Sequence, residues 1–159
     1  MRTVAVIGPG EADEATLTVA HEVGRLVAER GWEVLTGGLG GVMAAAASGA
    51  REAGGTAIGL LPGDDGAAGD PAHNVLVPTG LGQLRNGLIV QTANGVIAVG
   101  GSWGTLSEIA LAQRTGVPVV CIGGWSVHDA TGGEIALHRC DSAETAVTRL
   151  AELIGRMDG

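Results

Sequence analysis

Arg85 and Glu108 are the residues whose type and placement point most directly to chemistry. They are the only formally charged side chains between residues 71 and 113. An arginine at a helix start opposes the helix dipole, so its placement there favours a functional role such as pairing with a phosphate or carboxylate. We therefore interpret Arg85 as an anion-binding residue. The alternative is a surface arginine whose stem covers Leu81 and Leu88.

Glu108 has two interpretations. Thr105-Leu106-Ser107-Glu108 has the pattern of a capping box, in which Thr105 caps a helix and Glu108 reaches back to the N–H of the cap. A lone carboxylate beside an anion site can instead bind a ligand hydroxyl or transfer a proton. The sequence leaves both open.

Two ring-bearing side chains lie near these positions. Trp103 is a candidate stacking platform for a planar ligand ring, with ordinary burial or a subunit contact as the alternative. His73 lies in a polar loop from which it could overhang the same site. Both roles depend on where the loops are placed in space.

The two cysteines lack CxxC spacing, and the sequence predicts two reduced thiols, Cys121 and Cys140. A metal site that combines Cys140 with His128 and His138 matches no closed zinc pattern. We therefore expect no metal site.

Glycine-rich turns follow three of the apolar stretches. Glycine makes up 29 of the 159 residues while hydrophobic residues make up 45%, which excludes a collagen-like or disordered chain. The turns are Gly8-Pro9-Gly10, Thr36-Gly37-Gly38 with Gly41-Val42-Met43, and Gly100-Gly101-Ser102-Trp103-Gly104-Thr105. Glycine lets a backbone approach a phosphate without a Cβ in the way, so these turns predict a phosphate-bearing ligand.

The elements around these turns predict a single domain over residues 1–159. Continuous apolar runs at 4–7, 34–35, 56–61, 75–77, 96–99 and 117–122 alternate with helical patterns, as expected for a parallel sheet covered on both faces. The fold class is therefore α/β, with a Rossmann-like doubly wound sheet. In such sheets, ligands bind outside the carboxyl ends of the strands. The sequence leaves open whether residues 125–159 add a strand and a helix or fold over the site.

Composition and motifs exclude several functions. A net charge of −8 and the absence of lysine argue against nucleic acid and anionic membranes as partners. The lysine-dependent loop GxxxxGK[ST] is ruled out, and Gly8-Pro9-Gly10-Glu11-Ala12-Asp13 lacks the third glycine of the dinucleotide fingerprint GxGxxG. With no secretory leader or long apolar run recognised, the sequence predicts a cytoplasmic protein.

Taken together, the glycine turns resemble the molybdenum cofactor carrier protein-like group of the LOG (LONELY GUY) superfamily, many members of which are labelled possible lysine decarboxylase. The resemblance also rests on Gly31-Trp32, Glu52-Ala53-Gly54-Gly55-Thr56, Leu61-Pro62-Gly63, Thr79-Gly80-Leu81-Gly82 and Gly104-Thr105 with Glu108, and it spans roughly residues 3–124. It implies a Rossmann-like sheet, a homodimer or larger homo-oligomer, and a nucleotide or cofactor-phosphate site at the glycine turns. A chain without lysine cannot form the Schiff base that pyridoxal phosphate chemistry needs.

LOG enzymes cleave the N-glycosidic bond of cytokinin nucleoside monophosphates with an arginine–lysine pair and the motif PGGxGTxxE. In this sequence the arginine matches Arg85 and the glutamate matches Glu108. The lysine is replaced by Asn86, the proline by Gly100, the second glycine by Ser102 and the penultimate residue by Ser107. Loss of the lysine weakens the case for hydrolysis more than the case for phosphate binding.

We therefore predict a protein that binds a phosphorylated nucleotide-like or pterin ligand, requires no cofactor, and can carry molybdenum cofactor. The alternatives are a phosphoribohydrolase acting on AMP or cytokinin riboside monophosphate through Glu108 and Arg85, and a nucleotide-sensing module that assembles with an enzyme. The candidate ligand-binding residues are Gly8, Pro9, Gly10, Thr36, Gly37, Gly38, Gly41, Val42, Met43, Arg85, Asn86, Gly100, Gly101, Ser102, Trp103, Gly104, Thr105 and Glu108.

Overall fold

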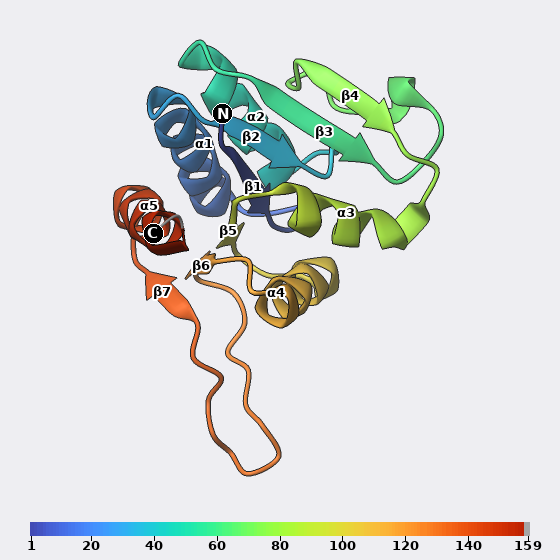
Figure 1. The fold of residues 1–159 in the computed structure, drawn as a ribbon. Coiled ribbons are helices and arrows are strands. Elements are labelled where there is room, and N and C mark those ends of the chain that lie inside the picture. The colour runs from blue at the N-terminus through green and yellow to red at the C-terminus, as the bar shows by residue number, and fades with distance from the viewer. Residues whose placement is uncertain (158–159) are drawn as a thin grey trace.

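The computed structural model, which describes residues 1–157, contains one seven-stranded sheet with helices on both faces (Figure 1). The strand order is β4-β3-β2-β1-β5-β6-β7, and every neighbouring pair is parallel. The strands are β1 (Thr3–Ile7), β2 (Glu33–Thr36), β3 (Ala57–Leu61), β4 (Val75–Pro78), β5 (Gly95–Val99), β6 (Val119–Ile122) and β7 (His138–Cys140). The predicted fold class is confirmed.

Five α-helices connect or follow the strands: α1 (Glu14–Glu29), α2 (Val42–Glu52), α3 (Arg85–Thr92), α4 (Trp103–Thr115) and α5 (Ala143–Met157). Two short 3-10 helices, η1 (Gly66–Ala68) and η2 (Gly82–Leu84), lie in the connections on either side of β4. The helix ends follow local sequence signals. The Asp13 carboxylate accepts the Thr16 N–H at the start of α1, and Gly116 ends α4 in the left-handed conformation, with φ 76°.

The two faces of the sheet are covered by different helices. Helices α1, α2 and α5 pack on one face, where the strands contribute Val4, Val6 and Ile97. Helices α3 and α4 pack on the other face, against Ala5 and Ile7. All of these strand residues are buried, which explains why the strands appear in the sequence as continuous apolar runs.

The direction of chain winding reverses between β1 and β5, which are neighbours in the sheet although α1 to α3 separate them in sequence. Strands β2, β3 and β4 extend the sheet to one side of β1, and β5, β6 and β7 extend it to the other. Such a switch point opens a crevice at the carboxyl ends of the strands. The turns after β1, β2 and β5 all lie at this edge.

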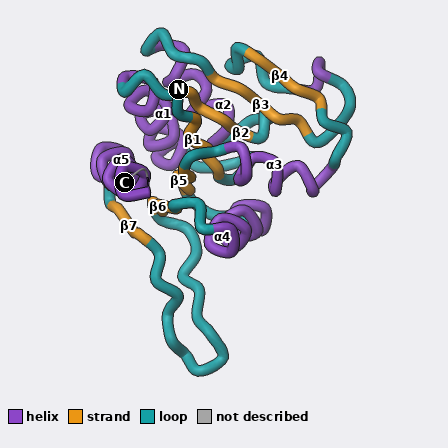
Figure 2. The backbone as a smooth tube through the Cα atoms, in the orientation of Figure 1, coloured by secondary structure: helices purple, strands orange, loops and turns teal. Residues whose placement is uncertain are grey.

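Within residues 125–157 the chain adds a strand and a helix, which is one of the two alternatives expected. Between β6 and β7, residues 123–137 form an extended arm that projects from the body (Figure 2), with a bridge between His128 and Glu134. The arm is tied to the body by Trp125, whose indole N–H donates to the Ser102 carbonyl at 2.9 Å. No helix among the described residues is long and apolar enough to span a membrane.

Candidate functional site

A cavity of about 210 Å³ opens at the switch point. Its walls come from the turns after β1, β2 and β5 and from the segment that begins α3. The lining residues are Ile7, Gly8, Gly10, Gly37, Leu39, Met43, Gln83, Arg85, Asn86, Ser102, Gly104, Thr105 and Glu108. The cavity thus brings together Arg85 and Glu108, which are 23 positions apart in sequence.

The turns after β1 and β2 are in direct contact with each other. Gly41 has φ 64°, and a Cβ there would lie 2.4 Å from the Gly10 and Pro9 carbonyl oxygens. The Val42 N–H donates to the Pro9 carbonyl at 3.1 Å. Pro9, Gly41 and Val42 therefore hold the two turns together and do not line the cavity.

Arg85 is buried, with 8% of its surface exposed, so the alternative of a surface arginine is wrong. Its guanidinium lies against Gly37, where a Cβ would come within 2.3 Å of Nη1. Its Nε has no hydrogen-bond partner among the described residues. Burial lowers the pKa of Arg85, and Glu108 partly opposes this effect. A buried cation with an unused N–H donor is costly unless a ligand pairs with it.

Glu108 is also buried, with 5% of its surface exposed. Burial raises its pKa to about 7, although the positive charge of Arg85 acts in the opposite direction. Among the ion pairs within residues 1–157, none joins these two side chains. Both groups therefore remain available to a ligand in the cavity.

The capping-box alternative for Glu108 is wrong. Helix α4 begins at Trp103, and Ser102 caps it by accepting the Thr105 N–H at 3.3 Å. Glu108 lies six positions after the cap, beyond the first turn, and cannot reach the N–H that a capping glutamate binds. The sequence pattern was ambiguous because Ser102 and Thr105 are three positions apart, as are Thr105 and Glu108. Either Ser102 or Thr105 could therefore be the residue that caps the helix.

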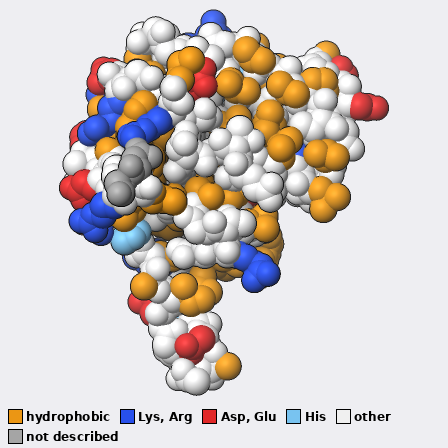
Figure 3. Space-filling model, viewed as in Figure 1, with side chains coloured by type: hydrophobic (Ala, Val, Ile, Leu, Met, Phe, Trp, Pro, Cys, Tyr) orange, Lys and Arg blue, Asp and Glu red, His pale blue; other side chains and the backbone are white. Residues whose placement is uncertain are grey.

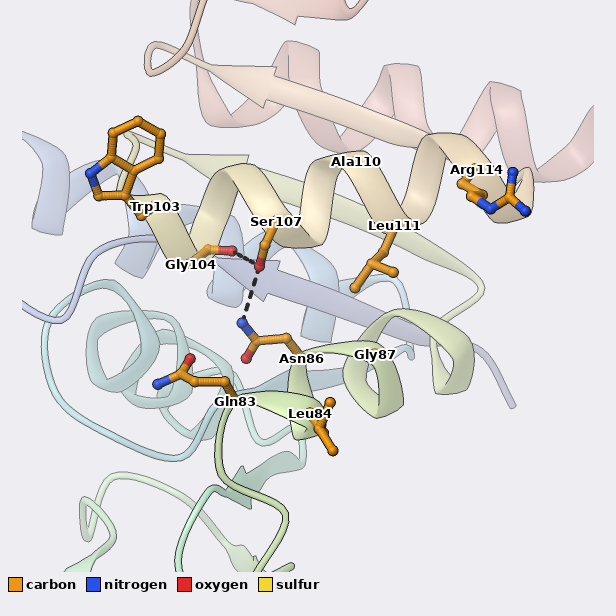
Figure 4. Close-up of a pocket in the computed structure, with 10 residues that line it drawn as sticks. All are labelled: Gln83, Leu84, Asn86, Gly87, Trp103, Gly104, Ser107, Ala110, Leu111 and Arg114. Atoms are coloured by element: carbon orange, nitrogen blue, oxygen red, sulfur yellow. Dashed lines mark hydrogen bonds between the residues drawn. The ribbon is translucent and has the colours of Figure 1, made fainter.

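An outer groove of about 740 Å³ continues from the cavity between η2, α3 and α4 (Figure 4). Gln83, Asn86 and Gly104 line both spaces. The Asn86 amide donates to the Ser107 hydroxyl at 3.3 Å, and that hydroxyl donates to the Gly104 carbonyl at 2.7 Å. Asn86, which lies at the position of the lysine in LOG enzymes, thus connects α3 to α4.

Trp103 lies at the end of this groove and is 77% exposed, so ordinary burial does not explain it. Its ring centroid is 5.0 Å from that of Trp125, and the planes are tilted by 42°. The pair stands beside the turn after β5, where a Cβ at Gly101 would meet the Trp125 ring at 2.9 Å. Trp103 therefore stacks near Trp125 at the end of the groove, with most of its surface exposed.

Thr36 and His73 lie behind the cavity and do not line it. Both are buried, and the Thr36 hydroxyl is 2.6 Å from His73 Nε2. The same hydroxyl accepts the Gly38 N–H at 2.9 Å. The structure thus places His73 beneath the turn after β2, and the expectation that it could overhang the site is wrong.

The structure brings most of the predicted residues to the cavity wall and separates others from it. Seven predicted residues do not line the cavity or the groove: Pro9, Thr36, Gly38, Gly41, Val42, Gly100 and Gly101. Three residues of the cavity wall were not predicted, Ile7, Leu39 and Gln83, and the groove adds six more: Leu84, Gly87, Ser107, Ala110, Leu111 and Arg114. Gln83 carries the one available signal, because it precedes Arg85 by two positions in a segment with few polar side chains.

Within residues 1–157, no group of three or more His, Cys, Asp or Glu side chains is arranged to hold a metal ion. Cys121 and Cys140 are free thiols. They pack on opposite faces of the sheet, because Cys121 belongs to the α3–α4 side and Cys140 to the α1–α5 side.

Comparison with known proteins agrees with this architecture. The model of the SLOG cluster4 family matches residues 1–151. A protein of Archaeoglobus fulgidus described as uncharacterized is 43% identical over 119 residues, which cover 75% of this chain and 78% of that protein.

Three solved structures illustrate the structural likeness. The molybdenum cofactor binding protein from Rippkaea orientalis has a TM-score of 0.86 and 34% identity, over 96% of this chain and 97% of that one. The molybdenum cofactor carrier protein from Chlamydomonas reinhardtii has a TM-score of 0.84 and 35% identity, over 97% and 98%. DNA processing protein A from Helicobacter pylori, at 17% identity and a TM-score of 0.70 over 95% and 80%, shares the fold alone.

Proposed function

This chain belongs to the SLOG cluster4 family, and on that basis we propose that it binds a phosphorylated small molecule, with molybdenum cofactor as the favoured ligand. The observation that carries the proposal is the buried Arg85 guanidinium, whose Nε lacks a partner among the described residues and which faces a cavity walled by glycine turns. An anionic group of the ligand would pair with the positive charge of this guanidinium. The start of α4 adds backbone N–H groups at the same wall.

The residues present fit this ligand class. In the proposal, Arg85 clamps the phosphate, and Gly8, Gly10 and Gly37 let the backbone approach it. The cofactor brings its own pterin and metal chemistry, so the protein needs only to bind it and limit its contact with water. The outer groove and the exposed face of Trp103 are suited to a planar ring.

The test is binding of inorganic phosphate and AMP by the purified protein, measured by calorimetry. We expect Arg85→Met, which keeps the length of the side chain, to weaken binding by roughly tenfold or more, as expected for a charge-assisted hydrogen-bond pair. Arg156→Met is the matched control, because Arg156 is an exposed arginine in the last turn of α5. Unchanged phosphate binding in Arg85→Met would refute the proposal. Mass spectrometry of pterin and molybdenum retained after mild purification then tests the ligand.

A second candidate function is hydrolysis of the N-glycosidic bond of a nucleoside 5′-monophosphate. It is favoured by Glu108, a buried carboxyl in the cavity whose pKa of about 7 suits proton transfer near neutral pH. The presence of Asn86 in place of a lysine argues against it. Incubation with AMP and with cytokinin riboside monophosphate, followed by detection of the free base, decides the matter. Turnover that is lost in Glu108→Gln would displace the carrier function.

We also propose that the chain forms a homodimer or larger homo-oligomer in the cytoplasm. Support comes from exposed apolar side chains on β4, just before η2 and on α3, namely Val75, Val77, Leu81 and Leu88 (Figure 3). Light scattering measures the mass in solution, and Leu88→Asp should reduce it. An unchanged mass in this variant would exclude this surface as the contact.

A further inference from the structure

We propose that Thr36 and His73 are positioning residues that hold the turn after β2 against Arg85 and make anion binding depend on the protonation state of His73. The inference rests on the proposed function, because it concerns how the same site is held in shape. Neither residue lines the cavity, so both would act through Gly37 and Gly38.

The hydrogen bonds around His73 define one proton arrangement. His73 Nδ1 lies 3.0 Å from the Asp70 carbonyl oxygen, which can only accept, so Nδ1 carries the proton. In a neutral ring Nε2 is then an acceptor, and it receives the Thr36 hydroxyl proton at 2.6 Å. The Thr36 oxygen accepts the Gly38 N–H in turn, which completes a chain from Asp70 to Gly38.

A second contact ties the same two segments together. The Asp70 N–H donates to the Gly38 carbonyl at 2.9 Å, so both polar groups of Gly38 are used. Gly38 has φ 78°, and a Cβ there would lie 2.7 Å from the Leu61 side chain. The turn is therefore fixed by hydrogen bonds on one side and by packing on the other.

The held turn forms the surface on which the Arg85 guanidinium lies. Gly37 is adjacent to Gly38, and its Cα is so close to the guanidinium that a Cβ would overlap both terminal nitrogens. A shift of this turn by a few tenths of an ångström therefore changes the direction of the Arg85 donors. Charge-assisted hydrogen bonds lose strength steeply when their geometry is poor.

Protonation of His73 breaks the chain. Both ring nitrogens then donate, so the Thr36 hydroxyl must accept from His73 as well as from Gly38, and its own proton has no acceptor in a buried position. Burial lowers the pKa of His73, which Asp70 partly opposes. The ring is packed against Gly59 of β3, and the nearby Arg51 of α2 donates to the Pro71 and Ala72 carbonyls of the same loop. The ring is therefore neutral at pH 7 and charged only in acid.

The first experiment compares two substitutions at Thr36 by calorimetric titration with inorganic phosphate at pH 7.5. Thr36→Val keeps the shape and removes the hydroxyl, and we expect about fivefold to tenfold weaker binding, the usual effect of one lost hydrogen bond. Thr36→Ser keeps the hydroxyl and should bind within about twofold of the wild type. Thermal unfolding confirms that both variants are folded.

The outcomes separate this inference from the proposed function. If Arg85→Met loses phosphate binding while Thr36→Val binds as tightly as the wild type, the positioning role is refuted and the proposed function stands. If Arg85→Met also binds normally, the anion site itself is refuted, and this inference fails with it.

The second experiment measures the pH dependence with sulfate, whose charge is constant between pH 5 and 8. Glu108→Gln is the background, because it removes the titration of the carboxyl group that lines the cavity. We expect sulfate binding to weaken by about fivefold or more once acid protonates His73, because the Thr36 hydrogen bond is lost. His73→Gln in the same background should be insensitive to pH. An equal loss in acid with and without His73 would overturn the proposal.

Discussion

The two helix layers of this protein use small and charged residues in opposite ways. In the α1–α2 layer, Gly24 and Gly49 lie where the two helices touch. A Cβ at Gly24 would lie 1.9 Å from the Ala46 carbonyl oxygen, and one at Gly49 would lie 2.0 Å from the His21 carbonyl oxygen. The charged side chains of α1 stay on its surface, where Arg25 pairs with Glu22 and Glu29. In the α3–α4 layer the charged residues Arg85 and Glu108 are buried and unpaired with each other.

This difference indicates which layer supplies stability and which supplies binding. Close backbone packing with satisfied polar groups stabilises a fold. A buried cation with an unused donor and a carboxyl with a raised pKa both destabilise the ligand-free protein. The α3–α4 layer therefore lowers the free energy of unfolding of the ligand-free protein, and a bound ligand would raise it again.

The substitution with the largest expected effect disrupts the contact between α1 and α2. We expect Gly49→Ala to destabilise the protein by about 3 kcal/mol or more, because the new methyl group overlaps backbone that cannot move aside cheaply. Gly155→Ala is the control, since that helical glycine has open space around it and should gain about 0.5–1 kcal/mol. Urea unfolding measures both, and an equal response at the two positions would contradict the close-packing account.

The next effect concerns Glu108 and depends on pH. Its pKa is about 7 when folded and near 4.5 when unfolded, so the folded state binds more protons between these values and stability falls as pH rises through this window. Glu108→Gln should therefore stabilise the protein by up to about 3 kcal/mol above pH 8 and by little at pH 4. Chemical unfolding at the two pH values measures the difference. A pH-independent effect would show that Glu108 is not a buried titrating group.

Arg85→Met should also stabilise the ligand-free protein, by less than Glu108→Gln does at high pH. Replacing an unsatisfied buried guanidinium by a thioether of similar length should stabilise the ligand-free protein by about 1 kcal/mol. Added phosphate should raise the melting temperature of the wild type and leave that of the variant unchanged. If the ligand-free variant were less stable than the ligand-free wild type, Arg85 would be a residue that stabilises the fold.

The smallest change in stability is expected at Trp103. Its exposed ring contributes little packing, so Trp103→Ala should alter the free energy of unfolding by less than about 0.5 kcal/mol. The substitution should nevertheless weaken the binding of AMP by about fivefold more than the binding of ribose 5-phosphate, because ribose 5-phosphate lacks the planar ring. Equal losses for the two ligands, measured by calorimetry, would exclude stacking.

Much of the fold was predictable because the strands are buried on both faces. Continuous apolar runs marked six strands, and β7 was left open because His138–Cys140 is short and largely exposed. The turns after β1, β2 and β5 were correctly grouped, since parallel strands end at one edge. The roles within the turns were not predictable, because Gly41 differs from the lining glycines only in what it contacts.

The sequence by itself determined the layered sheet, the place of the crevice and the isolation of Arg85 and Glu108 from other charges. These depend on hydrophobic period and local turn chemistry, which neighbouring residues encode. Only the tertiary structure decided that Glu108 is buried with a raised pKa and that His73 lies beneath the turn after β2. Burial and hydrogen-bond partners depend on residues distant in sequence, and a lone charge or histidine has no local pattern that reveals them.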